Sequence, residues 1–540
     1  MNRYLFTFLS TMLLSAYAGR AQVQATEPPH TATVAVFSIN DFHGAFVQDV
    51  DKDIPGAASV LACLDSLKTV YPYHLTVAAG DNFGGSYFYK ATKGALLPAF
   101  FDLAEINISA VGNHEFDDGQ AEFARKWQGD KLRPANWNLT YVCANIYDEA
   151  GNIPPYMQPF TIAEVPLSKE RSVKIALIGL LASSAKEQIK AQNTVGLSFS
   201  PRYTRVLDSI KALPEFAAVK ESTIRSLLIH IGTKMENGNP VWIDKSIDEL
   251  KAINDTFYHS ILSGHSHEPV CGTINDREIP VLQGWWHGAY ISVMKYEVDT
   301  LEMKVVKITP ELVRVPAKLP SELTGKAKRL QDMTDSLLVN TKTAAGVSIG
   351  TFLTVCTEDL HHDRTAKFVD SPVGTLVVNA FAESYREAAH KKDKDIIIGV
   401  SHFGGIRAGI SKGRLTVLDV GEVLPFGNPI RVYKVTGKEL YKLVDYGYHN
   451  QYFGRMQKSY LETEMDADGH VKQLTYVSPK GKRKKIKDNT LCYIVADEYM
   501  TTGGDDYSPE LFPNDKLVDI NLPLTTDAFI KYLQQQPQLP

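Results

Sequence analysis

The chain has 540 residues, 44% of them hydrophobic, and a formal net charge of −5. This length exceeds what one hydrophobic core usually holds, so we expect two large domains. The charge balance excludes the strongly basic proteins that bind nucleic acid or anionic membranes through their net charge.

The first 21 residues are typical of a secretory signal. Met1-Asn2-Arg3 precede an apolar stretch from Tyr4 to Ala18, and Ala16-Tyr17-Ala18 or Gly19-Arg20-Ala21 offers small residues for cleavage. The stretch is too short to span a bilayer, and no cysteine follows it directly. We therefore expect an exported protein, periplasmic or secreted, without a membrane anchor.

From residue 33 to about residue 299, apolar runs of strand length alternate with longer segments that fit helices. Ligand sites in open α/β sheets collect at the carboxyl ends of strands, so we expect one sheet edge to gather the polar residues that follow the runs. The runs span residues 34–39, 75–79, 106–111, 173–180, 227–229 and 260–262. The polar residues after them are Asp41, His43, Asp81, Asn113, His230, His265 and His267.

The pattern changes after residue 299. We expect a pair of strands from Lys304 to Val315, then a polar linking helix that runs to about Asn340 with Ser321 as a candidate N-cap. The second half predicts helices at 373–390 and 438–448 and strands at 395–400, 430–435 and 491–496. His361-His362 has no motif around it and is interpreted as a solvated turn.

The seven polar residues are a metal-ligand inventory. Mixed nitrogen and oxygen ligands suit zinc, manganese, iron or cobalt, and seven ligands are too many for one tetrahedral ion. Two divalent ions that share one carboxylate would use them all. We expect Asp81 to bridge, with Asp41, His43 and His267 on one ion and Asn113, His230 and His265 on the other. The five cysteines have no CxxC spacing and predict neither a zinc knuckle nor a redox pair.

His114 is expected to face substrate rather than metal. In an extended segment successive side chains face opposite ways, so His114 would point away from the ligand Asn113. Asp117 stands three residues on and can orient the ring. Two ions and two carboxylates leave a positive surplus that suits a phosphate dianion and activates water, with His114 stabilising the phosphoryl oxygens or protonating the leaving alkoxide.

These segments carry a family resemblance that covers nearly the whole mature chain. Five blocks resemble, in order, those of the calcineurin-like metallophosphoesterases: Asp41-Phe42-His43, Gly80-Asp81-Asn82, Gly112-Asn113-His114-Glu115-Phe116-Asp117, His230-Ile231-Gly232 and Gly264-His265-Ser266-His267. Three later blocks resemble the C-terminal domain of the 5′-nucleotidase family, which includes the bacterial periplasmic UDP-sugar hydrolase/5′-nucleotidases: Gly404-Gly405-Ile406-Arg407, Leu424-Pro425-Phe426-Gly427-Asn428 and Gly503-Gly504-Asp505.

The resemblance implies an α/β fold with a four-layer α/β/β/α metallophosphoesterase domain and a second α/β substrate-binding domain. We expect a signal peptide at 1–21, the catalytic domain at 30–318, a linker helix at 319–342 and a nucleotide-binding domain at 343–530. By the same likeness Phe426 and Tyr499 would stack on the base, Asp505 would take the ribose hydroxyls and Arg407 would reach ribose or phosphate. His402 and Pro372 stand where many or some relatives have Asn and Arg.

The leading hypothesis is an exported dinuclear-metal phosphatase that hydrolyses nucleoside 5′-monophosphates with metal-activated water, with UDP-sugars as a further candidate substrate. Its partner is a nucleotide, not nucleic acid, and the sequence does not distinguish a monomer from a dimer. A 2′,3′-cyclic-nucleotide phosphodiesterase with 3′-nucleotidase activity, or a thiosulfohydrolase, would share the first domain. A non-catalytic nucleotide-binding surface protein is the alternative of a different class.

Overall fold

The computed structural model describes residues 30–50, 52–128, 139–253, 256–275, 279–318, 322–450 and 454–540. The expected signal segment lies outside these residues. None of the described helices is both long and apolar enough to cross a bilayer.

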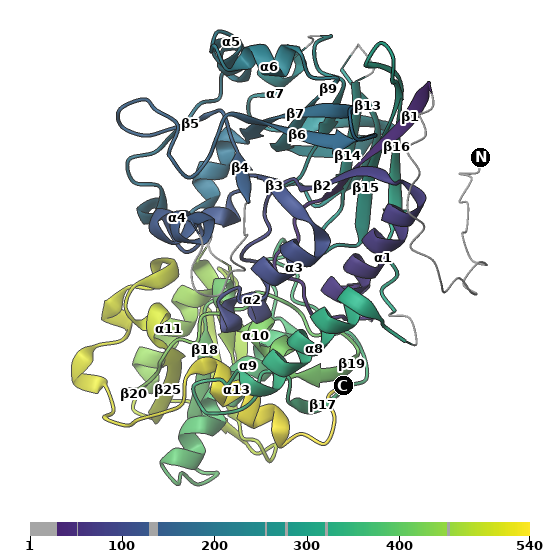
Figure 1. The fold of residues 1–540 in the computed structure, drawn as a ribbon. Helices are drawn as coiled ribbons and strands as arrows, with labels where there is room; N and C mark the ends of the chain where they lie inside the picture. The colour runs from purple at the N-terminus through teal and green to yellow at the C-terminus, as the bar shows by residue number, and fades with distance from the viewer. Residues whose placement is uncertain are drawn as a thin grey trace.

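Two six-stranded sheets form the N-terminal half (Figure 1). In the first, β1 pairs parallel to β2 and antiparallel to β15. Its order is β16 (Lys304–Arg314), β15 (Tyr290–Asp299), β1 (Thr31–Ile39), β2 (Tyr73–Ala78), β3 (Ile106–Ala110) and β4 (Thr140–Val142). The order of the second is β13 (Pro269–Ile274), β14 (Ile279–Gly284), β12 (Ser260–Leu262), β9 (Ile224–His230), β7 (Ser172–Leu181) and β6 (Phe160–Pro166).

The two sheets pack face to face. Successive residues of a strand point to opposite sides of the sheet, so each sheet has one face toward the other sheet and one face toward the helices. In β1, Val34 and Val36 join an inner core with Leu177 of β7 and Leu228 of β9, whereas Phe37 faces outward. Helices α1 (Gly56–Val70) and α3 (Leu97–Ala104) cover the outer face of the first sheet. Helices α5 (Tyr203–Lys211) and α6 (Phe216–Lys220) cover the second. The predicted α/β fold with a four-layer α/β/β/α first domain is confirmed. The strand ends that carry the polar residues belong to two sheets, where the strand pattern alone predicted one sheet edge.

Two predictions around the midpoint of the chain need correction. Residues 304–314 form the single long strand β16 rather than a pair of strands. The following helix, α8 (Gly325–Asn340), begins at Gly325 with the extended residue Thr324 before it. The candidate cap Ser321 lies outside the described residues. Helix α8 packs on α1 and α3.

The C-terminal half is built on a four-stranded sheet. Its order is β20 (Ile430–Thr436), β25 (Leu491–Asp497), β18 (Ile397–Ser401) and β21 (Gln457–Lys458). Ile398 and Val400 of β18 face a core that includes Leu440 and Leu443 of α11 (Gly437–His449), and Ile397 faces α9 (Pro372–Ala388). Further elements are the hairpin β17 (Phe352–Cys356) with β19 (Gly413–Thr416), the sheet β22 (Leu461–Met465), β23 (Val471–Val477) and β24 (Arg483–Lys485), and the helices α10 (Val417–Val423), α12 (Glu498–Thr501) and α13 (Thr525–Gln534).

The start of α9 shows how Pro372 fits the fold, and a contact there corrects the prediction for His362. Pro372 occupies the first turn, where its missing N–H is not needed, and the Ser371 hydroxyl accepts from the Gly374 N–H at 3.1 Å. His362 is buried: its Nδ1 lies 2.9 Å from the Ser371 hydroxyl and its ring packs on Phe403. The solvated turn expected at His361-His362 is therefore wrong for His362.

The two halves meet where α2 (Tyr87–Thr92) packs on α10. The Tyr87 N–H donates to Glu422 at 2.5 Å, and a Cβ added at Gly421 would lie 2.1 Å from the Tyr87 ring. Lys52 forms an ion pair with Asp419 at 2.8 Å. This contact brings α2, which begins just after the Asp81 loop, to the C-terminal half.

Candidate metal and nucleotide site

The seven predicted ligands lie together, at the end of one strand and in the loops that follow four others. Asp41 and His43 follow β1, Asp81 follows β2, Asn113 follows β3, His230 ends β9, and His265 and His267 follow β12. Backbone hydrogen bonds join the first two loops, from Asp41 N to Gly80 O at 3.0 Å and from His43 N to Asp81 O at 3.1 Å. Both sheets thus deliver side chains to a shared edge.

Five of the seven have a left-handed backbone, which non-glycine residues adopt at a cost of about 1 to 3 kcal/mol. The residues and their φ angles are Asp41 (48°), His43 (51°), Asp81 (53°), His265 (90°) and His267 (54°). Such strain persists where surrounding structure enforces it, and it concentrates at functional sites. The site therefore depends on a backbone conformation that Asp and His adopt more often than most residues but that remains uncommon.

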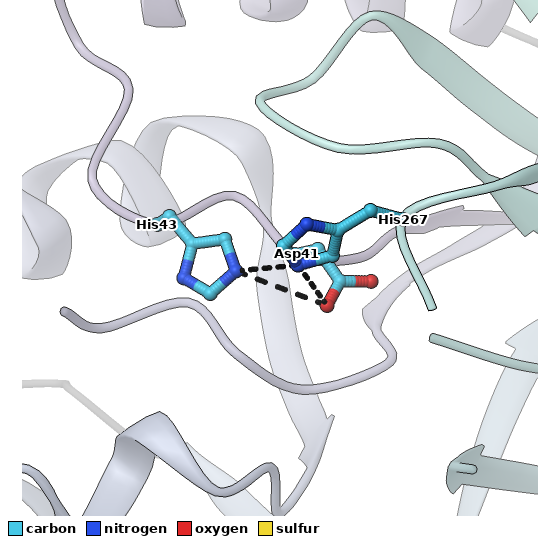
Figure 2. Close-up of side chains that lie close together, drawn as sticks. All are labelled: Asp41, His43 and His267. Atoms are coloured by element: carbon cyan, nitrogen blue, oxygen red, sulfur yellow. Dashed lines mark hydrogen bonds and ion pairs between the residues drawn. The ribbon is translucent and has the colours of Figure 1, made fainter. Parts of the chain in front are cut away.

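Asp41, His43 and His267 form the first group (Figure 2). The Nε2 atoms of His43 and His267 are 3.0 Å apart, and His267 Nε2 lies 3.4 Å from Asp41 Oδ1. His43 Nδ1 donates to the Phe83 carbonyl at 3.4 Å, so its Nε2 carries a lone pair. Burial lowers the pKa of His43 to about 4, which keeps the ring neutral.

Asp81, His230 and His265 form the second group. His230 Nδ1 donates to the Ala79 carbonyl at 2.8 Å, and its Nε2 points at Asp81 Oδ2 at 3.0 Å. Asn113 joins them, with its Oδ1 3.1 Å from His265 Nδ1. Asp81 Oδ2 also lies 4.0 Å from His43 Nε2, so Asp81 stands between the two groups.

The donor set fits divalent metal ions. His230 Nε2 is buried and faces Asp81 Oδ2 without forming a hydrogen bond to any of the described residues. The His43 and His267 Nε2 atoms and Asp41 Oδ1 also face one another. Burial opposes protonation of His230, yet Asp81 and Asp41 raise its pKa to about 10. A positive charge at the centre of the cluster would therefore be stabilised by the carboxylates. Mixed imidazole and carboxylate ligands suit Zn²⁺, Mn²⁺ and similar divalent ions.

His114 lies at the rim of this cluster, one third exposed. Its Nδ1 is 2.7 Å from Asp117 Oδ2, and its backbone N–H donates to Asp81 Oδ1 at 2.8 Å. Burial opposes protonation, but Asp117 and Asp81 raise the pKa of His114 to about 9. The extended segment that we expected here is wrong: Asn113 has helical φ and ψ, and residues 114–116 form a 3₁₀ turn. His114, His43 and Asp81 also lie close enough together to share an ion.

Glu115 stabilises this turn through hydrogen bonds to backbone N–H groups, a role that was not predicted from the sequence. Its buried carboxylate accepts from the N–H groups of Asp81 (3.0 Å), Asn82 (3.0 Å) and Gly112 (2.8 Å). Burial and the nearby charge of Asp81 raise its pKa to about 7. Gly112 is required, because a Cβ there would lie 2.2 Å from Asp81 Oδ1.

Replacing Glu115 with alanine is expected to lower the free energy of unfolding by about 3 kcal/mol, because buried N–H donors lose a charged acceptor. Urea denaturation measures the change. The control Glu302→Ala removes an exposed carboxylate and should stay within about 0.5 kcal/mol of the parent. Equal stability of the two variants would contradict the role assigned to Glu115.

Asn40 and Trp286 were not predicted as site residues. The Asn40 Nδ2 group donates to Asp41 Oδ2 at 2.7 Å and to the Trp285 carbonyl at 2.6 Å. The Trp286 ring stacks on His267 with centroids 5.1 Å apart. Trp286 therefore covers a predicted ligand rather than lying in the core. A polar residue next to Asp41 and an aromatic pair near the histidine block were the available signals.

The four residues predicted for the nucleoside lie in the C-terminal half. Phe426 and Tyr499 are exposed by 53% and 47%. The Arg407 guanidinium lies 5.7 Å from the Phe426 ring centre. Asp505 accepts from the Tyr499 hydroxyl at 3.2 Å.

His402 joins these residues. Its Nδ1 is 2.6 Å from Asp505 Oδ2, and its ring packs beside Tyr499. His402 and Phe426 line one pocket with Asn428 and Asp497. From the other half, Lys90 donates to the Pro425 carbonyl and lies 5.7 Å from the Phe426 ring centre.

Comparisons with known proteins find likenesses in the C-terminal half and along most of the chain. Residues 348–511 match the family model described as 5′-nucleotidase, C-terminal domain. The Bacillus subtilis protein named endonuclease YhcR is 25% identical over 82% of this chain, which spans 35% of that relative. A Vibrio parahaemolyticus protein named 5′-nucleotidase is 24% identical, covering 84% of each chain.

Among solved structures, the 5′-nucleotidase precursor of Thermus thermophilus shares the fold. The TM-score is 0.58 at 21% identity, over 94% of this chain and 97% of that chain. Residues 348–511 thus match the C-terminal domain of the 5′-nucleotidases, and the chain is similar to a protein named 5′-nucleotidase over most of its length.

Proposed function

We propose that the chain is a metal-dependent phosphoric ester hydrolase that converts nucleoside 5′-monophosphates to nucleoside and phosphate. The observation that carries this proposal is the convergence of two carboxylates, one carboxamide and four imidazoles beside His114. The match of residues 348–511 to the 5′-nucleotidase C-terminal domain, and the likeness to a protein named 5′-nucleotidase, support the same activity. UDP-sugars are a further substrate class consistent with the family likeness.

The ligand assignment follows the two groups. Asp41, His43 and His267 would hold one ion; Asn113, His230 and His265 would hold the other, with Asp81 between them. Two bound divalent ions would supply positive charge for the phosphate and lower the pKa of a water molecule. Zinc and manganese both accept these ligands.

In this proposal, His114 positions the phosphate and donates a proton to the leaving group. His114 is held by Asp117 with Nδ1 as donor, so its Nε2 is the ring atom available to substrate. A protonated ring donates to a phosphoryl oxygen or to the leaving alkoxide. No serine or cysteine nucleophile is needed, so the expected reaction forms no covalent enzyme intermediate.

Phe426 and Tyr499 are proposed to hold the base between their faces. Both rings are about half exposed, and an aromatic face stacks on any base. Asp505 would accept from ribose hydroxyls, and His402 holds the Asp505 carboxylate in place. Arg407 lies beside Phe426 and would reach ribose or phosphate.

Phe426→Ala is expected to raise the KM for AMP about 10- to 100-fold, because stacking contributes about 1 to 3 kcal/mol per base. The kcat should change little, since the ring does not touch the reacting phosphorus. Phe352→Ala, which removes an exposed phenylalanine on β17, is the matched control. A Phe426→Ala enzyme with unchanged KM would remove Phe426 from the nucleoside site.

A substrate panel tests the activity. Purified protein loaded with Zn²⁺ or Mn²⁺ should release phosphate from AMP, and the panel includes UDP-glucose, 2′,3′-cyclic AMP, p-nitrophenyl phosphate and a thiosulfonate ester. Hydrolysis of the cyclic nucleotide alone would replace the proposal with the phosphodiesterase alternative, and turnover of only the sulfur substrate would favour the thiosulfohydrolase. Binding of AMP without phosphate release would assign a non-catalytic nucleotide-binding role.

We also propose domain limits and location. The catalytic domain would span 30–318, the linking segment 319–342 and the nucleotide-binding domain 343–530. Export rests on the charged start and apolar stretch of residues 1–21. N-terminal sequencing of the mature protein should find cleavage after Ala18 or Ala21, and an intact Met1 on exported protein would count against a cleaved signal.

A further inference from the structure

Three potential metal ligands gather on the C-terminal half, away from the residues of the proposed active site. Asp445 and His449 lie four residues apart on α11 and therefore on one face of the helix. His470 directly precedes β23. One ligand atom from each residue lies within 4.8 Å of the others.

Asp445 orients both imidazole rings. His449 Nδ1 donates to the Asp445 carbonyl at 2.8 Å, and His470 Nδ1 donates to the Asp445 carboxylate at 3.0 Å. Both Nδ1 atoms therefore face oxygen atoms of Asp445, and an ion bound there would replace the protons that they carry.

The two rings lie nearly face to face, with centroids 4.7 Å apart and planes inclined by 29°. The side chains are 43% exposed for His449 and 58% exposed for His470, so an ion can reach both from solvent. Solvent therefore reaches the ring nitrogens of both residues.

The turn that carries His470 is already fixed. Asp466 Oδ1 accepts from the N–H groups of Asp468 and His470, each at 2.9 Å. The next residue, Val471, donates to Asp445 Oδ1 at 2.8 Å. Binding at His470 would thus cost little ordering of the backbone, which favours affinity.

We propose that Asp445, His449 and His470 together bind one divalent transition-metal ion. Two imidazole ligands select Zn²⁺, Cu²⁺ or Ni²⁺ over Mg²⁺ or Ca²⁺, which prefer oxygen. The ion would link the C-terminal end of α11 to the start of β23. This site is additional to the ions proposed for the catalytic half and does not depend on them.

Equilibrium dialysis of the full-length protein against micromolar Zn²⁺, followed by elemental analysis, tests the proposal. The parent protein should carry one Zn²⁺ more per chain than His449→Ala or His470→Ala, and Asp445→Asn should bind that ion about 10- to 100-fold more weakly. His361→Ala, which removes another exposed histidine, is the matched control and should retain the parent stoichiometry. Hydrolysis of AMP should be the same in all four variants, which separates this site from the catalytic ions.

Electron paramagnetic resonance with Cu²⁺ gives a second measurement, made on the parent protein and on a double variant. One additional equivalent of Cu²⁺ on the parent protein should show coupling to imidazole nitrogen, and the signal should be absent from the His449→Ala and His470→Ala double variant. The same Zn²⁺ stoichiometry in the parent and double variant would overturn the proposal, as would a Cu²⁺ signal that the double variant retains.

Discussion

Replacing Asp81 with alanine is expected to remove both bound ions and to lower the turnover of AMP by at least about 10³-fold, since metal ions contribute several kcal/mol and each 1.36 kcal/mol is a factor of ten. Asp81 is the residue that both groups share: its Oδ2 lies 3.0 Å from His230 Nε2 and 4.0 Å from His43 Nε2. Its Oδ1 accepts a hydrogen bond from the His114 N–H at 2.8 Å, so the change also removes a contact that fixes the 3₁₀ turn at residues 114–116. Elemental analysis and phosphate release measure the two effects.

Two variants make the Asp81 result interpretable. Asp81→Asn keeps the shape and one oxygen, so it should retain the fold while binding metal more weakly than the parent protein. Asp208→Asn neutralises an exposed carboxylate of α5 and should change neither metal content nor turnover. An Asp81→Ala protein that kept two ions would show that the cluster has no shared carboxylate.

Replacing His114 with alanine is expected to lower kcat by about 10²- to 10⁴-fold while the metal content stays the same. The Nδ1 of His114 is committed to Asp117 at 2.7 Å, so the ring is oriented as an acid or a hydrogen-bond donor toward substrate. Steady-state kinetics and elemental analysis of one preparation separate the two properties. Asp117→Asn should produce a smaller loss of kcat, because the ring remains but is less firmly oriented.

The structure gives the His114 experiment a definite alternative. His114, His43 and Asp81 lie close enough to hold an ion together. If His114→Ala lost metal in proportion to activity, His114 would be reassigned as a ligand. The control His361→Ala, which removes an exposed imidazole of the C-terminal half, should show neither loss.

Much of this architecture was predictable from the sequence. The apolar runs before Asp41, Asp81 and His230 mark buried strands, and the polar residue after each run marks a strand end. The helices near Val373 and Lys438 were predicted to within a few residues. In the structure they begin directly after Ser371 and Thr436, whose side chains cap them.

Other features depend on contacts between distant segments. The pairing of strands into two sheets is decided by which faces pack together, and a run such as Val34 to Ile39 is equally apolar in either arrangement. The left-handed backbone of Asp41 and His265 is imposed by the folded loops, because neither residue type signals it strongly. His362 is buried where it contacts Ser371 and Phe403, and its sequence neighbours do not indicate these contacts.

Elemental quantification combined with anomalous scattering from a crystal grown with saturating Mn²⁺ or Zn²⁺ tests the dinuclear site most directly. We expect two anomalous peaks in the N-terminal half, one beside Asp41, His43 and His267 and one beside Asn113, His230 and His265, with Asp81 contacting both. A single peak at full metal loading, or two peaks away from these residues, would contradict the proposed site.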